Sequence, residues 1–129
     1  MLAAQVSTSR TQLISIRLQS LIDSAPDVLG AAVVSTEGLS IASVLKPPID
    51  EDRVAAMSAA MLSLGERIAT ELGRGAMEQV FIKGTDGYAL LVSVSPQAVL
   101  TIVSRGDAKL GMLLLELRNA VADLRLLVD

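Results

Sequence analysis

The amino-acid sequence predicts an α/β (α+β) fold in which helices cover both faces of a five-stranded antiparallel sheet. Three observations support this prediction. Apolar residues recur at helical spacing in three segments, and five other segments are short apolar or alternating runs typical of strands. Short turns separate most of the strands, which favours antiparallel pairing. The strands are apolar on both sides, so each sheet face needs a covering layer. The predicted order is helix, two strands, helix, three strands, helix.

The first helix is predicted over Ser9–Ser24, where Pro26 follows its end. Strands at Val28–Ser35 and Leu39–Leu45 then flank a short turn that contains Gly38. The prolines of Lys46-Pro47-Pro48 end the second strand, because proline has no backbone N–H to donate. This part of the chain is therefore expected to form a helix and a hairpin.

The middle helix is predicted over Glu51–Leu72, with Asp50 as its N-cap and Gly73 after its end. Its segment VAAMSAAMLSLG (54–65) contains no charged residue, although an exposed helix side normally carries charge. One side of the helix holds alanine and serine. The other is a stripe of large residues that is wide enough to cover a sheet face, namely Val54, Met57, Met61, Leu64, Ile68 and Leu72. A helix with two dry sides predicts contact with a second chain, and either side suits the sheet or the partner.

Three strands are predicted at Met77–Lys83, Tyr88–Ser95 and Ala98–Ser104, followed by a helix that begins at Asp107. The last helix has an apolar stripe of Leu110, Leu114, Leu117, Val121 and Leu124. Met77–Lys83 is the most polar strand and is expected at a sheet edge, where it either blocks or accepts strand pairing. The uncharged run Gly87–Ser104 contains a central Pro96-Gln97 and falls short of the roughly twenty apolar residues of a membrane span, so a buried hairpin is predicted there.

Composition excludes several classes of function. The 129-residue length suits one domain (1–129), with a core at about 9–127 and flexible residues 1–8. The net charge of −3 and the two aromatic residues argue against nucleic-acid binding. The chain has no histidine and no cysteine, so no metal site, cofactor site or catalytic residue is predicted, and a protein that is not an enzyme is expected. The lack of cysteine fits the cytoplasm, and no membrane insertion is expected.

The sequence also resembles a known family. The order of elements and the stretches GAAVVSTEGLSIAS (30–43), RVAAMSAAMLSLGERIATELGRGAMEQVFIKGTDGYALL (53–91) and LGMLLLELRNAVADL (110–124) are similar to the Roadblock, or dynein light chain, family in its bacterial form. The resemblance extends from about Ser9 to Leu127. It implies a profilin-like and Roadblock-like fold, homodimers formed through the middle helix and the following strand, and partnership with a small Ras-like GTPase as a regulator or effector platform.

We therefore expect the chain to be a homodimeric interaction module. The predicted dimer interface consists of Met57, Ala60, Met61, Leu64, Ile68, Val80 and Ile82. Arg53 and Arg67 are predicted to contribute polar contacts to the GTPase. Two other functions remain open at this point: a structural adaptor that is indifferent to nucleotide state, and a sensory domain that binds a small ligand between helix and sheet. The sensory domain would need a cavity with convergent polar groups.

Overall fold

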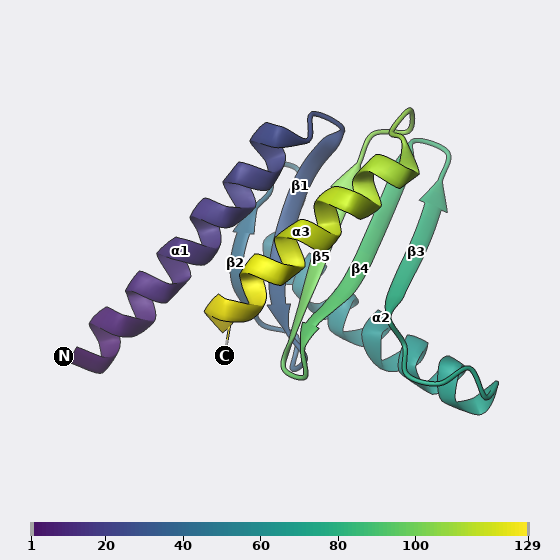
Figure 1. The fold of residues 1–129 in the computed structure, drawn as a ribbon, viewed down its shortest axis with the longest axis horizontal. Coiled ribbons are helices and arrows are strands. Elements are labelled where there is room, and N and C mark those ends of the chain that lie inside the picture. Colours follow the sequence, from purple (N-terminus) through teal and green to yellow (C-terminus); the bar gives the residue numbers. More distant parts are fainter. Residues whose placement is uncertain (1, 129) are drawn as a thin grey trace.

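The computed structural model describes residues 2–128 (Figure 1). Its elements are α1 (Leu2–Ser24), β1 (Val28–Ser35), β2 (Ser40–Val44), α2 (Glu51–Glu71), β3 (Gln79–Gly84), β4 (Gly87–Ser95), β5 (Ala98–Ser104) and α3 (Leu110–Val128). The five strands form one antiparallel sheet in the order β2-β1-β5-β4-β3. Figure 1 shows α1 and α3 on one face of this sheet and α2 on the other. The predicted fold class and element order are confirmed.

Both terminal helices differ from their predicted bounds at the N-terminal end. α1 begins at Leu2 rather than Ser9, because no proline or glycine interrupts the chain before Ser24. The flexibility expected of residues 1–8 stays a prediction for 2–8, whose backbone is helical, and Met1 lies outside the described residues. α3 begins at Leu110 rather than Asp107, because Ala108 N donates to Arg105 O in a tight turn before the helix.

The larger core lies between the sheet and the α1/α3 layer. α1 contributes Ile14, Leu18 and Leu21, which repeat at helical spacing and are fully buried. Their partners from α3 and the strands are likewise aliphatic and buried, and include Leu117, Leu124, Val33, Leu90, Leu100 and Ile102. Arg17 Nε and Asp123 Oδ2 join α1 to α3 at 2.7 Å on the outer side of this layer. The core therefore depends on aliphatic packing, as the scarcity of aromatic residues predicts.

The second face of the sheet packs against α2 in two small clusters. Ala55 meets Ala32 and Val34 of β1, and Leu62 meets Leu91 and Val99 of β4 and β5. Leu91 faces α2 while its neighbour Leu90 faces α1 and α3, so β4 is apolar on both sides, as predicted. No helix within residues 2–128 is long and apolar enough to cross a membrane. The run Gly87–Ser104 instead forms the β4–β5 hairpin, which confirms that prediction.

Candidate interaction surface

The rotation of α2 about its own axis determines which of its side chains are exposed to solvent. Ala55, Ser58 and Leu62 are the buried residues of this helix, and they lie on its sheet side. The opposite side exposes four large apolar residues in a row. Their exposed fractions are 57% for Met57, 50% for Leu64, 49% for Ile68 and 67% for Leu72, and we call these four the outer stripe. An apolar row of this kind on a small domain is typical of a protein–protein contact.

The outer stripe answers a question that the sequence leaves open. The large residues of the middle helix were expected to be able to cover a sheet face, but only Val54 and Met61 of that set are partly buried against it. Ala55, Ser58 and Leu62 face the sheet instead. Ser58 Oγ and Thr101 Oγ1 hydrogen-bond at 2.8 Å in the buried layer, which requires a close approach of α2 to β5. Alanine and serine permit that approach, whereas methionine and leucine at these positions would hold the helix away.

β3 forms one end of the sheet, as the polar pattern of Met77–Lys83 predicts. Its outer edge has no neighbouring strand within the described chain, and Lys83 is the only charged residue of the strand. Ile82 is 43% exposed, whereas Val80 is partly buried beside Leu62. One charge gives an edge strand limited protection against pairing with another chain.

Gly65 brings α2 close to the segment that leads into β3. A Cβ at this position would lie 2.5 Å from Met77 Sδ and 3.3 Å from Val80 Cγ2. The glycine thus admits Met77 and Val80 against the helix. As a result the second half of α2 and the edge strand share one packed cluster, and their exposed sides lie in one region of the surface.

Two arginines flank the outer stripe. Arg53 lies in the first turn of α2, where its backbone N–H is 3.4 Å from Asp50 Oδ1, and its side chain is exposed. Arg67 is exposed further along and pairs with Glu71 at 3.2 Å. Fourteen residues along a helix correspond to about 21 Å and bring the two side chains to nearly the same side. The surface therefore combines an apolar centre with separated positive charges.

The predicted interface residues divide into two groups. Met57, Ala60, Leu64, Ile68 and Ile82 are exposed, while Met61 and Val80 are partly buried in the cluster beneath α2. Asp50, Glu51 and Asp52 surround the helix start, where the Asp50 carboxylate accepts from Asp52 N at 3.0 Å, as predicted for an N-cap. Among the residues that the structure describes, no group of three acidic, histidine or cysteine side chains is placed to hold a metal ion.

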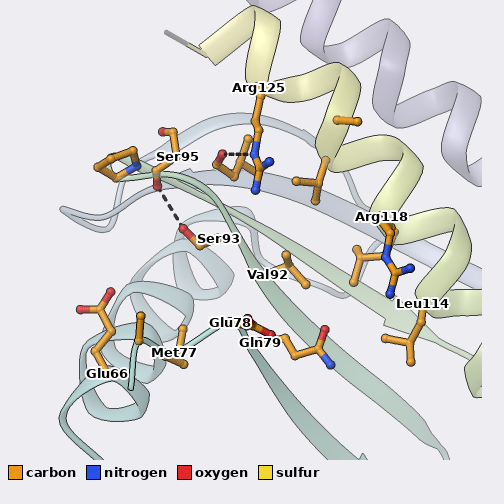
Figure 2. A pocket seen from close by; sticks show the side chains of 16 residues that line it. Glu66, Met77, Glu78, Gln79, Val92, Ser93, Ser95, Leu114, Arg118 and Arg125 are labelled. Atoms are coloured by element: carbon orange, nitrogen blue, oxygen red, sulfur yellow. Dashed lines mark hydrogen bonds between the residues drawn. The ribbon is translucent and has the colours of Figure 1, made fainter. Parts of the chain in front are cut away.

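A groove that lies beside α3 and reaches Glu66 of α2 past the end of β3 was not predicted from the sequence. It has a volume of about 880 Å³ and lies between α3, the end of β4 and the segment before β3 (Figure 2). Arg118 and Arg125 of α3 border it (Figure 2). Their seven-residue spacing places both on one side of the helix, and this is the signal that sequence reasoning could have used.

A model of the Roadblock/LC7 domain family matches residues 16–104, which include the outer stripe and the edge strand. The chain belongs to the Roadblock/LC7 family. A curated relative of this Roadblock/LC7 protein, an uncharacterised protein of Methanocaldococcus jannaschii, is 32% identical over 98 residues, which are 76% of this chain and 85% of the relative.

Two solved structures show the same fold. The Roadblock/LC7 domain from Streptomyces avermitilis has a TM-score of 0.81 at 20% identity and covers 86% of this chain and 93% of its own. MglB of Myxococcus xanthus has a TM-score of 0.83 at 19% identity and covers 89% of this chain and 86% of its own. At such identities the likeness concerns the fold alone.

Proposed function

We propose that this Roadblock/LC7 protein is a non-catalytic homodimeric interaction module that binds a small Ras-like GTPase, as its regulator or as an effector platform in the cytoplasm. The main support is the exposed apolar stripe of α2 beside an open edge strand. The family resemblance supports a small Ras-like GTPase as the partner. The single domain of residues 1–129, with its core at 9–127, is the unit that dimerises.

The dimer is proposed to form through α2 and β3 of both copies. A two-fold axis needs only one self-complementary patch, and α2 and β3 are neighbours in each copy. Met57, Ala60, Leu64, Ile68 and Ile82 supply the exposed contacts. Met61 and Val80 support these contacts from the cluster beneath. Pairing of β3 with its copy would use the free backbone groups of the edge.

The GTPase is proposed to bind across the paired α2 helices. Arg53 and Arg67 flank the outer stripe in each copy and would supply polar contacts at the margin of the complex. Charged residues at a rim mainly set the rate of association and its salt dependence. The sensory alternative receives less support. The polar groups buried between α2 and β5, Ser58 and Thr101, already bond to one another and leave no convergent group for a ligand there.

Light scattering on size-fractionated protein tests the dimer. Leu64→Glu or Ile82→Glu places a charge in the proposed interface and should convert dimers to monomers without loss of helical circular dichroism. Leu126→Glu is the matched control, because Leu126 is an exposed leucine at the far end of α3. A dimer that survives both interface substitutions would exclude this placement.

Capture experiments test the GTPase. The immobilised dimer is offered Ras-like proteins encoded in the same genome, loaded with GDP or with a GTP analogue. Nucleotide-dependent capture that Arg53→Glu/Arg67→Glu weakens would support the proposal. Equal capture in both states would favour the structural adaptor. No capture, together with thermal stabilisation by a small ligand, would favour the sensory domain.

A further inference from the structure

The groove beside α3 has one helical wall and one wall made by the approach to β3. α3 presents Leu117, Arg118, Val121 and Arg125 to it, Val92 of β4 lies at its base, and Met77 stands opposite (Figure 2). We call this feature the α3–β4 groove. Its length follows α3 from Leu114 to Arg125, which is about 16 Å of helix. The base and the helical wall are largely apolar.

The groove exists because β4 is longer than β3. The first residue of β3, Gln79, pairs with Val92, so Ser93–Ser95 have no neighbouring strand on that side. Coverage of this sheet face is also incomplete. Strands lie about 4.8 Å apart and helices pack about 8–10 Å apart, so one helix covers about two strands. Two helices therefore leave the fifth strand bare.

β3 is the bare strand of this face. α1 packs against β1 and β2, α3 packs against α1 and β4, and β3 packs against α2 on the opposite face. Figure 1 shows β3 lying to the side of α3. Phe81 of β3 is paired with the buried Leu90 and so faces the α3 layer, yet it is 44% exposed. No helix of the described chain covers β3 on this face, and the apolar base of the groove comes from Val92 and Val94 of β4.

Acidic and basic residues of α3 lie on different sides of the helix. Glu116 and Asp123 face α1, where they meet Ser24 Oγ at 3.4 Å and Arg17 Nε at 2.7 Å. Arg118 and Arg125 face the groove. Among the side chains that the structure describes (residues 10–128), no carboxylate forms an ion pair with either of these arginines.

The far wall of the groove carries the opposite charge. Glu66 and Glu78 border the groove on the side away from α3 (Figure 2). An anionic group is therefore favoured only along α3 itself, where the two arginines stand. An occupant must present its negative charges on one side, the side that faces α3.

The free end of β4 is poorly suited to accept a strand. Arg125 Nε donates to Val94 O at 3.1 Å, and Ser93 Oγ donates to Ser95 O at 3.1 Å (Figure 2). These bonds, together with the register shift between Ser93 and Ser95, make the end of β4 irregular, which disfavours the regular ladder that an added strand needs. Side chains, rather than backbone groups, are what the groove offers to a partner.

We propose that the α3–β4 groove docks an amphipathic helix of another protein, whose apolar side lies on β4 and the apolar residues of α3 and whose carboxylates meet Arg118 and Arg125. The two arginines are seven residues apart, or about 10 Å along α3. A helix parallel or antiparallel to α3 would match them with two acidic residues that are also seven apart. The occupant would meet Arg118 and Arg125 of α3 rather than the outer stripe of α2, so the proposal does not rest on the dimer or on the GTPase.

A pair of synthetic peptides tests the proposal with the 129-residue chain. Both are fluorescein-labelled, stabilised helices with a leucine stripe. One carries two glutamates seven residues apart beside the stripe, and the other carries two lysines at the same places. Fluorescence anisotropy should show that the glutamate peptide binds at least about tenfold more tightly than the lysine peptide, with a difference that shrinks as salt rises.

Charge reversal in the protein then assigns the site. Arg118→Glu/Arg125→Glu should invert the preference, so that the lysine peptide binds more tightly, and circular dichroism checks that the fold is kept. Arg10→Glu/Lys46→Glu, which reverses two exposed positive charges outside the groove, is the matched control and should leave the preference unchanged. Equal binding of the two peptides, or no binding up to about 1 mM, would overturn the proposal.

Two further outcomes would also overturn it. The first is a preference for the glutamate peptide that survives reversal of Arg118 and Arg125, because the peptide would then bind elsewhere. The second is Arg118- and Arg125-dependent binding to phosphatidylglycerol vesicles without any preference between the peptides. That result would identify a lipid-binding surface rather than a helix-docking groove.

Discussion

The hydroxyl oxygens of Ser58 and Thr101 lie 2.8 Å apart in the buried layer between α2 and β5. Ala55 and Leu62 lie about one turn away on either side of Ser58 and pack on the same sheet face. A buried hydroxyl needs a partner, so any roll of α2 that separated the pair would leave two unsatisfied groups. The bond therefore helps to keep the outer stripe of α2 on the exposed side.

Removal of one hydroxyl should cost more than removal of both. Ser58→Ala leaves the Thr101 hydroxyl buried without its partner and should lower the free energy of unfolding by about 1–3 kcal/mol. Thr101→Val should act in the same way. In urea unfolding, the double variant should lose less than the sum of the single losses, with a coupling of about 1 kcal/mol. Strictly additive losses would show that the two hydroxyls do not stabilise α2 jointly.

Substitutions at two leucines of α2 should distinguish an effect on folding of the monomer from an effect on dimer association. Leu62 is buried against Leu91 and Val99, so Leu62→Ala should cost about 2–4 kcal/mol at every protein concentration. Leu64 is half-exposed, so Leu64→Ala should leave the folded monomer almost unchanged. Its thermal midpoint should fall only where protein concentration determines the dimer population. Equal, concentration-independent losses at both positions would place both leucines in the monomer core.

The pattern of α2 explains where sequence reasoning succeeds and where it stops. Helical spacing and the lack of charge predict the helix and its two dry sides. They do not show which side meets the sheet. The stripe of larger apolar residues would be expected to be buried, yet in the structure most of it is exposed. The answer depends on how closely β1 and β5 approach the helix, and Thr101 lies 43 residues from its partner Ser58. How closely the strands approach α2 is therefore set by the whole fold rather than by the local sequence.

The α3–β4 groove was missed for a related reason. Its basic wall belongs to α3, while its base depends on β4 extending past Val92, where the pairing with β3 ends. A sequence shows approximate strand ends, and an error of two residues is enough to hide the gap. Seven-residue spacing of Arg118 and Arg125, on the side opposite Glu116 and Asp123, was visible in the sequence. It predicts a basic helix side, although not what lies beside it.

Glycine at position 87 is required by a backbone contact. A Cβ at Gly87 would collide with the carbonyl oxygen of Ser104 on the neighbouring strand. The obstacle is backbone, so neither strand can yield without disturbing the β4–β5 ladder. Gly87→Ala should therefore lower the free energy of unfolding by more than about 3 kcal/mol, measured by chemical denaturation.

Gly111 provides the matched control for this substitution. A Cβ there meets no atom within 4 Å, and the residue lies in the first turn of α3. Gly111→Ala should raise the free energy of unfolding by about 0.5–1 kcal/mol, because alanine has the higher helix propensity. If Gly87→Ala were tolerated as well as Gly111→Ala, the close approach of Gly87 to Ser104 would be wrong.

The ion pair between Arg17 and Asp123 should contribute more than the pair on the surface of α2. The Arg17 side chain is 20% exposed between α1 and α3, whereas Arg67 and Glu71 are 77% and 67% exposed. Asp123→Asn should lower the free energy of unfolding by up to about 1 kcal/mol, and Glu71→Gln by about 0.3 kcal/mol or less. Unfolding in low salt and in about 1 M salt measures both, and screening should reduce the difference. A larger loss from Glu71→Gln would mean that Arg17 and Asp123 do not join the two helices in solution.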